Sequence, residues 1–189
     1  NISSFHMEWL SDGLSFLING ATDDQSGYGA DIYRINSATG DIVNLTDTPS
    51  DDQLQRLSPD SMQIAFTSSR SGGNQLFVMA VDGSQVRQLT DDSRLITDIS
   101  WSPDGTRIAY FDLEGGFHHL RVVRLFDDGT YEITDPMLTE QIEISNTIQW
   151  SPDNTRIAYT TVYGELYVMH INGDDIHRLT PIYGELIIP

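Results

Sequence analysis

Four tandem repeats of one short pattern constrain this chain more strongly than any other feature of its 189 residues. In each repeat a tryptophan or leucine leads a turn and an apolar strand, and a second apolar stretch closes on Leu-Thr or Ile-Thr. The opening segments are WLSDGLSFLI from Trp9, LSPDSMQIAF from Leu57, WSPDGTRIAY from Trp101 and WSPDNTRIAY from Trp150. Intervals of 44, 44 and 46 residues separate the closing threonines, which are Thr46, Thr90, Thr134 and Thr180. A period near 44 is typical of β-propellers, whose four-stranded blades take about 40–45 residues each.

Each repeat divides into four short strands. In the third repeat we expect these strands at 95–101, 107–110, 120–125 and 130–134. Apolar and polar residues alternate within the runs, which is the period of a strand, and no capped helical stripe interrupts them. The sequence therefore predicts an all-β chain, a β-propeller made of four-stranded antiparallel blades, with four blades in this chain.

The repeats predict a single propeller domain over residues 1–189. We expect the blades at about 1–46, 47–90, 91–134 and 135–180, and we expect 181–189 to be the start of a further strand or a tail. Both ends fall in the same phase of the repeat, between the last strand of one blade and the first strand of the next. Three arrangements stay open: a fragment of a larger propeller, a half that pairs with a second copy to make eight blades, and a closed four-bladed ring.

Aspartates recur in the turn that follows the leading tryptophan or leucine. In the Ser-Pro-Asp-Gly run at 102–105, proline presets one dihedral angle, aspartate bonds neighbouring amides and glycine accepts positive φ. We therefore assign a turn-stabilising role, rather than a catalytic one, to Asp12, Asp60, Asp104 and Asp153. The tryptophans share one position in the repeat, and we expect their side chains to pack between blades.

The chain is strongly acidic, with 28 acidic residues, 10 basic residues and a net charge of −18. Such a charge repels phosphate backbones and anionic membrane surfaces, so we expect no nucleic-acid partner. No run approaches the roughly 20 apolar residues of a membrane helix, and we expect no membrane insertion. The charge favours solubility and attraction to a basic patch on a protein.

Motifs for catalysis are missing from the sequence. There is no G-x-S-x-G, H-E-x-x-H or Walker pattern, and there is no cysteine. The adjacent His118 and His119 would point to opposite faces of a strand, which hinders a shared metal. We therefore predict no catalytic residue and no cofactor. Calcium, which takes about 6–8 oxygen ligands, is the alternative, and its candidate ligands are Asp51, Asp52, Asp91 and Asp92.

The longer connections between strands are the predicted binding surface, with the central opening of the propeller as the alternative. In an antiparallel blade the tight turns gather on one face, and the longer, more varied loops gather on the opposite face. Variable loops on a rigid scaffold commonly carry binding residues, and aromatic and arginine side chains are common interface anchors. The predicted partner-binding residues are Tyr28, Arg70, Arg94, Phe117, His118 and Tyr163.

The phrase W-S-P-D-G-x-x-I-A-Y at 101–110, with L-Y-V-M and R-x-L-T later in the repeat, resembles the repeat of the TolB propeller family. The resemblance runs from about residue 8 to residue 180. The first repeat departs from it by lacking the proline, and the second has Leu57 in place of tryptophan. TolB is the periplasmic propeller of the Tol–Pal envelope system, and similar repeats form the propellers that cover prolyl-oligopeptidase-type peptidases.

The resemblance implies a non-catalytic protein-binding or scaffold propeller, which captures a protein partner or associates with itself. It also implies a periplasmic, cell-surface or secreted location. Two alternatives stay open. One is the gating propeller portion of a larger hydrolase or lyase, and the other is a self-assembling structural surface protein.

Overall fold

The computed structural model describes residues 2–22, 29–92, 94–134 and 144–180, which form strands and turns. Within them we find no helix long and apolar enough to cross a bilayer. Blade 1 contains β1 (Ile2–Trp9), β2 (Ser15–Thr22), β3 (Asp31–Asn36) and β4 (Ile42–Asn44). Blade 2 contains β5 (Asp52–Leu57), β6 (Gln63–Ser68), β7 (Gln75–Ala80) and β8 (Arg87–Gln88). Blade 3 contains β9 (Leu95–Trp101), β10 (Arg107–Glu114), β11 (Phe117–Leu125) and β12 (Tyr131–Thr134). Blade 4 contains β13 (Ile144–Trp150), β14 (Arg156–Thr161), β15 (Leu166–His170) and β16 (His177–Arg178).

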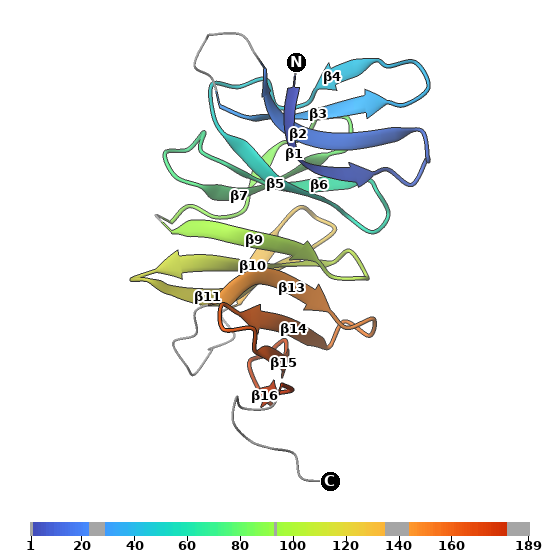
Figure 1. Ribbon diagram of the computed structural model, residues 1–189. Helices are drawn as coiled ribbons and strands as arrows, with labels where there is room; N and C mark the ends of the chain where they lie inside the picture. The colour runs from blue at the N-terminus through green and yellow to red at the C-terminus, as the bar shows by residue number, and fades with distance from the viewer. Residues whose placement is uncertain (1, 23–28, 93, 135–143, 181–189) are drawn as a thin grey trace.

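Every blade is a meander in which each strand pairs antiparallel with the next, as the sequence predicts. The blades follow one another along the molecule, and their first strands, β1, β5, β9 and β13, lie in neighbouring positions (Figure 1). Blade 1 and blade 4 occupy opposite ends of this row (Figure 1). The described chain is thus an open arc of four blades rather than the closed four-bladed ring that the sequence also allowed.

Three apolar clusters hold the arc together, one at each joint between neighbouring blades. Blades 1 and 2 meet through side chains such as Leu17 and Phe66, blades 2 and 3 through Leu89 and Tyr110. Blades 3 and 4 meet in the same way through a cluster that includes Phe111. Because the strands alternate their side chains between two faces, one sheet contributes to two joints at once.

The leading tryptophans add a hydrogen bond to the apolar contacts between blades. The Trp101 indole N–H donates to the Arg56 carbonyl of the preceding blade at 3.0 Å. The Trp150 indole N–H donates to the Ser100 carbonyl at 3.1 Å. The prediction that the tryptophans pack between blades is therefore confirmed for these two. It is wrong for Trp9 within this chain, because that side chain is 60% exposed at the open end of blade 1.

The closing threonine ties the last strand of a blade to the start of its third strand. The Thr46 hydroxyl accepts from the Ile32 N–H at 3.0 Å, and the Thr90 hydroxyl accepts from the Leu76 N–H at 2.9 Å. The Thr180 hydroxyl accepts from the Leu166 N–H at 3.1 Å. These N–H groups lie at strand starts without a ladder partner from their own sheet, so a hydroxyl at this position satisfies a donor that would otherwise be lost. This role accounts for the repeated Leu-Thr of the sequence.

The turn aspartates bond within their own turns. The Asp12 carboxylate accepts from the N–H groups of Leu14 and Ser15 at 2.7 and 2.9 Å. The Asp153 carboxylate accepts from the Ser151 hydroxyl at 2.6 Å and from the Thr155 N–H at 3.1 Å. Asp60 and Asp104 make the corresponding bonds to Ser58 and Ser102, both at 2.6 Å. Four carboxylates are thus used locally, one in each blade.

Replacing Thr90 by valine removes the bond to Leu76 while keeping the shape of the side chain. Both groups are buried, so the Leu76 N–H loses its partner and the free energy of unfolding should fall by about 1–3 kcal/mol. Thr134→Val is the matched control, because Thr134 is exposed and its hydroxyl donates only to the Val122 carbonyl at 3.2 Å. Urea unfolding measures both. Equal losses in the two variants would contradict this role for Thr90.

Acid should weaken the fold through the turn carboxylates. The hydrogen bond from Ser151, and then those from Thr155, lower the pKa of Asp153 from 3.8 to about 2. A depressed pKa stabilises the folded state above the unfolded value, and that stability is lost as the pH falls from about 4 towards 2. We therefore expect Asp153→Asn to lower the melting temperature at pH 6 and to match the unmodified chain near pH 2. A constant difference between the two proteins across this range would contradict the assignment.

Candidate functional site

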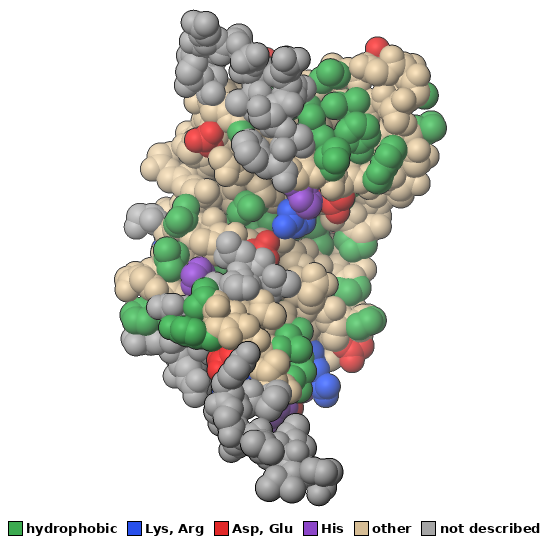
Figure 2. All heavy atoms as spheres, viewed as in Figure 1, with side chains coloured by type: hydrophobic (Ala, Val, Ile, Leu, Met, Phe, Trp, Pro, Cys, Tyr) green, Lys and Arg blue, Asp and Glu red, His purple; other side chains and the backbone are tan. Residues whose placement is uncertain are grey.

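The first strands of all four blades line one cleft of about 450 Å³ on the inner side of the arc. One position of the repeat dominates it, the residue immediately before the leading tryptophan or leucine. That position is occupied by Glu8, Arg56, Ser100 and Gln149. The space-filling view from the side of these strands shows basic, acidic and histidine side chains together near the middle of the molecule (Figure 2). We call this site the inner cleft.

Arg56 is the basic residue that lines the inner cleft. Its guanidinium donates to the Gln55 carbonyl at 3.0 Å and pairs with the Asp98 carboxylate at 3.4 Å. The Arg56 side chain keeps 29% of its surface exposed, whereas the Asp98 side chain keeps 9%. The cation is therefore held in place from one side and remains accessible from the other.

Asp98 joins the third blade to the fourth. One carboxylate oxygen accepts from the Ile99 N–H at 2.9 Å, and the other accepts from the Ile148 N–H at 3.1 Å. Burial raises the pKa of this carboxyl, and the Arg56 guanidinium and both N–H groups oppose the rise. The carboxylate thus forms part of the cleft wall and fixes two inner strands relative to each other.

Glu8 performs a similar task between blades 1 and 2. Its carboxylate accepts from the Leu57 N–H at 2.9 Å. Burial raises the pKa of Glu8, against the bond to Leu57 and the charge of Arg56. Leu57 cannot donate the indole bond that a tryptophan makes at this repeat position, so a carboxylate bond from blade 1 to the backbone of blade 2 supplements the apolar contact at this joint.

A second hollow of about 510 Å³ adjoins the inner cleft and shares Arg56 with it. Its lining includes His6 and Asn19 of blade 1, and burial, together with the charge of Arg56, lowers the pKa of His6. Oδ1 of Asn19, in this lining, and Oε1 of the neighbouring Gln55 are among the buried side-chain atoms of the described chain that lack a hydrogen-bond partner. Acceptors of this kind suit a ligand that brings N–H or O–H groups.

Irregular pairing of the inner strands shapes this region. The register of the inner strand against its neighbour shifts in every blade, for example between Gln53 and Arg56 of β5. Leu54, inside that shift, has a φ of 52°, which a non-glycine residue rarely adopts. Such bulges bend a strand and re-aim its side chains. They explain why neighbouring residues such as Gln55 and Arg56 can serve the joint and the cleft.

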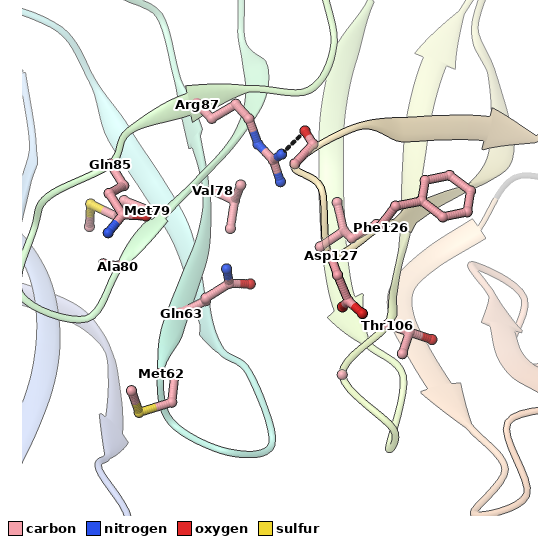
Figure 3. Close-up of a pocket in the computed structure, with 13 residues that line it drawn as sticks. Met62, Gln63, Val78, Met79, Ala80, Gln85, Arg87, Thr106, Phe126 and Asp127 are labelled. Atoms are coloured by element: carbon pink, nitrogen blue, oxygen red, sulfur yellow. Dashed lines mark hydrogen bonds between the residues drawn. The ribbon is translucent and has the colours of Figure 1, made fainter.

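A larger groove of about 660 Å³ lies between blades 2 and 3, away from the inner strands (Figure 3). Met62 and Val78 lie on its blade 2 side, and Phe126 lies on its blade 3 side (Figure 3). Arg87 reaches across it and donates to the Gly129 carbonyl (Figure 3). This groove draws on two blades, whereas the inner cleft draws on four, so we take the inner cleft as the candidate site.

Arg70, a predicted partner-binding residue, packs inward. Its guanidinium pairs with the buried Asp52 carboxylate at 3.0 Å. It also lies over the rings of Phe66 and Phe77, 5.3 and 5.2 Å from their centres. These contacts make Arg70 a stabilising residue of blade 2. They engage its guanidinium group within the blade.

Of the other predicted residues that the structure describes, Arg94, Phe117 and His118 lie near one another in blade 3, whereas Tyr163 lies in blade 4. Arg94 forms ion pairs with Asp92 and Glu114, both at 3.0 Å. Phe117 begins β11, and the ring of His118 lies 6.3 Å from that of Phe111. Tyr163, in the turn between β14 and β15, is 72% exposed. Tyr28 lies outside the described residues.

The four calcium candidates come from two separate connections between blades. The Asp51 carboxylate accepts from the Ala30 N–H at 2.9 Å, while Asp52 and Asp92 pair with arginines. Asp91 is exposed. In the part of the chain that the structure describes, no three acidic or histidine side chains gather closely enough to hold a metal ion.

Sequence reasoning predicted none of the residues of the inner cleft as binding residues. Its residues form no motif, and their chemistry differs from blade to blade. One signal could have indicated them. The residue before each leading tryptophan or leucine has the same position in every repeat, so these residues are expected to lie near one another in a propeller.

Removing Arg70 should destabilise the chain. Arg70→Met leaves the buried Asp52 carboxylate without its cation, which should lower the free energy of unfolding by about 3 kcal/mol. Arg94→Met is the matched control, because Arg121 still pairs with Asp112 at 2.5 Å in that region. We expect the control to cost about 0–1 kcal/mol, as for exposed pairs. If thermal unfolding ranked the two variants in the opposite order, the structural role of Arg70 would be wrong.

Comparison with known proteins agrees with the fold. The Uncharacterized peptidase YuxL of Bacillus subtilis is 30% identical over 104 residues, which are 53% of this chain and 16% of the relative. The Tol-Pal system protein TolB of Geobacter metallireducens is 34% identical over 79 residues, which are 40% of this chain and 18% of the relative. The chain thus spans less than a fifth of the length of either.

A solved structure, the putative TolB from Agrobacterium tumefaciens, has a TM-score of 0.70 at 18% identity and shares the fold. The match covers 92% of this chain and 64% of that one. The family model of the TolB beta propeller domain matches residues 9–147, most of the chain. The chain belongs to the TolB beta propeller domain family.

Proposed function

We propose that this chain is a non-catalytic protein-binding propeller that takes a segment of a partner protein in the inner cleft. The observation that supports the proposal is the convergence of all four inner strands on one concave site. A concave site formed by several rigid elements and lined by apolar and polar groups is the usual form of a binding site. Leu57, Trp101 and Ile148 supply the apolar part of the lining.

The polar groups of the site favour a partner rich in hydrogen-bond donors. Glu8 and Asp98 are carboxylates of the inner cleft, and the unpaired amide oxygen of Asn19 is an acceptor in the adjoining hollow. The net charge of −18 attracts a basic segment and speeds its association at low salt. The class of partner is therefore a peptide segment that carries basic and apolar side chains.

The fixed geometry of the charged groups supports binding rather than catalysis. Asp98 is held by two N–H groups and Arg56, and Glu8 is held by the Leu57 N–H. The bonds of Asp98 to Ile148 and Arg56, and that of Glu8 to Leu57, connect blades, so moving a proton on either carboxylate would disturb a joint. The serines of the turns, such as Ser102, donate to the aspartate of their own turn.

The proposed location is the periplasm, with the cell surface or the exterior as the alternatives. Support comes from the relative described as a Tol-Pal system protein, which shares the repeat with this chain. The absence of cysteine is compatible with each of these compartments.

A second candidate is the gating propeller portion of a larger hydrolase or lyase. It is favoured by the relative described as a peptidase, of which the matched region makes up 16%. The parent gene discriminates between the two candidates. A G-x-S-x-G domain encoded in the same reading frame would favour the second.

Peptide selection tests the binding role. Random 12-residue peptides displayed on phage are selected on the immobilised chain, and the enriched peptides are measured by fluorescence anisotropy. We expect enrichment of basic and apolar residues, and a dissociation constant that rises with salt.

Ser100→Arg places a bulky cation in the inner cleft. It should lower the affinity for the enriched peptides at least about tenfold, a loss of about 1.4 kcal/mol of binding free energy. Met62→Arg is the matched control, because Met62 is 62% exposed and lines the groove between blades 2 and 3. Near-UV circular dichroism checks that both variants fold. Absence of enriched peptides, or equal affinity for both variants, would reject the proposal.

A further inference from the structure

The hollow beside the inner cleft differs from the cleft in its charge. Arg56 lines both, but the two carboxylates of the cleft, Glu8 and Asp98, do not line the hollow. The residues that line the hollow are His6, Asn19, Gln53, Leu54 and Arg56. None of these is acidic, so the charged lining of this space of about 510 Å³ is basic in a chain whose net charge is −18.

The hollow lies where two irregular strands meet. The register of β1 shifts around His6, and the register of β5 shifts around Gln55. β5 lies beside β1 and β2 (Figure 1), and Nε2 of Gln55 donates across this joint to the His6 carbonyl at 3.1 Å. Because a bulge takes residues out of the ladder and re-aims their side chains, two facing bulges leave a space between the blades.

Asn19 brings a buried acceptor to this space. The residue is 5% exposed, and its Oδ1 has no hydrogen-bond partner in the described chain. β2 pairs with β1 through Ile18 and Gly20, on either side of Asn19, which therefore lies opposite the bulge of β1. At the same repeat position of blade 2, the Thr67 hydroxyl donates to the Gln53 carbonyl at 3.2 Å. An unsatisfied buried acceptor costs free energy, which a donor from a ligand recovers.

Arg56 brings donors to the same space. An arginine has five N–H donors, and Arg56 uses one on the Gln55 carbonyl and one on the Asp98 carboxylate. The remaining three make no hydrogen bond within the described chain. A guanidinium binds a carboxylate through two N–H groups at once, a geometry that a point charge does not offer.

We propose that the hollow binds the free carboxylate at the C-terminal end of a peptide. The Arg56 guanidinium donates to this carboxylate, and the N–H of the last peptide residue donates to Oδ1 of Asn19. A chain end carries the anion and the N–H group close together, which matches a cation and an acceptor that line one space. The carboxylate site stands on its own, whereas the path of the rest of the peptide rests on the proposed function.

The site sets the direction in which a bound segment lies. Its end occupies the hollow between blades 1 and 2, and the residues before the end extend into the inner cleft, because Arg56 lines both spaces. Basic side chains of these residues then meet Glu8 and Asp98. A segment with basic side chains and a free carboxylate at its end therefore matches the charges of both spaces.

A short probe tests the hollow without any segment for the cleft. N-acetyl-alanyl-alanine is added as the free acid or as the carboxamide to the nitrogen-15-labelled chain, and the side-chain signals of Asn19 and Arg56 are followed by NMR. We expect both signals to shift with the free acid, which should bind at least about tenfold more tightly than the carboxamide because its bonds to the guanidinium are charge-assisted. Equal affinities, or shifts confined to residues outside the hollow, would overturn the proposal.

A second probe separates a chain end from an acidic side chain. N-acetyl-alanyl-aspartic acid α-carboxamide carries one carboxylate as well, but on its side chain. We expect it to bind at least about threefold more weakly than the free acid, because its carboxylate and its backbone N–H are placed differently. Equal or tighter binding would assign the hollow to acidic side chains and overturn the assignment to a chain end.

Two variants use residues that the repeat already accommodates. Asn19→Thr introduces the residue type of blade 2 at this position, and Arg56→Gln introduces that of blade 4, so both should fold. Each should lower the affinity for the free acid at least about fivefold. Arg107→Gln is the matched control, because this side chain is 24% exposed, pairs with Asp104 and lies outside the hollow. Near-UV circular dichroism checks all three folds, and an equal loss in the control would count against the site.

The outcomes separate this inference from the proposed function. If the free acid binds in the hollow and no displayed peptide is enriched, the carboxylate site stands and the role in binding a segment fails. If enriched peptides bind in the inner cleft and the hollow does not prefer the free acid, that role stands and this inference fails. If neither binds, both fail.

Discussion

A small antiparallel sheet cannot cover its own apolar faces, and this constraint governs the whole molecule. The strands here run from two to nine residues, and each sheet contains four of them. Such a sheet becomes stable when both faces pack on neighbours, which is the logic of repeat architectures. Leu17 and Phe66 at the first joint, and Tyr110 at the second, are almost fully buried for this reason. The apolar contacts hold neighbouring blades together, and the hydrogen bonds between blades set their register.

Much of the fold could be predicted from the sequence because the pattern of one blade occurs four times. Spacing and alternation predicted the four-stranded meanders, and turn chemistry placed Asp12 and Asp153 correctly in tight turns. The shared position of the tryptophans predicted their place between blades, which holds for Trp101 and Trp150. Trp9 differs because burial depends on a neighbour, and a periodic pattern does not say whether that neighbour is present. Periodicity thus describes a unit better than it describes the ends of a row of units.

The candidate site was much harder to predict, for a physical reason. Loop length suggested Arg70 and Arg94 as binding residues, but both side chains are engaged by carboxylates of their own blades. A sequence does not reveal such pairs, because the partners are brought together by the tertiary fold. The bulges of the inner strands also escape prediction, since one extra residue shifts the register without leaving a motif. The chemistry of the inner cleft therefore emerged only from the arrangement of four blades.

The indole bond between blades has a consequence for how such a molecule can change. Its acceptor is a main-chain carbonyl, which every type of residue offers. The indole bond therefore does not require a particular side chain at the acceptor residue, and this side chain lines the inner cleft, as with Arg56 and Ser100. At this position of the repeat, the backbone carbonyl serves the joint between blades and the side chain lines the binding site. Evolution can therefore change the type of residue at this position, and with it the lining of the cleft, while the indole bond to the backbone is kept.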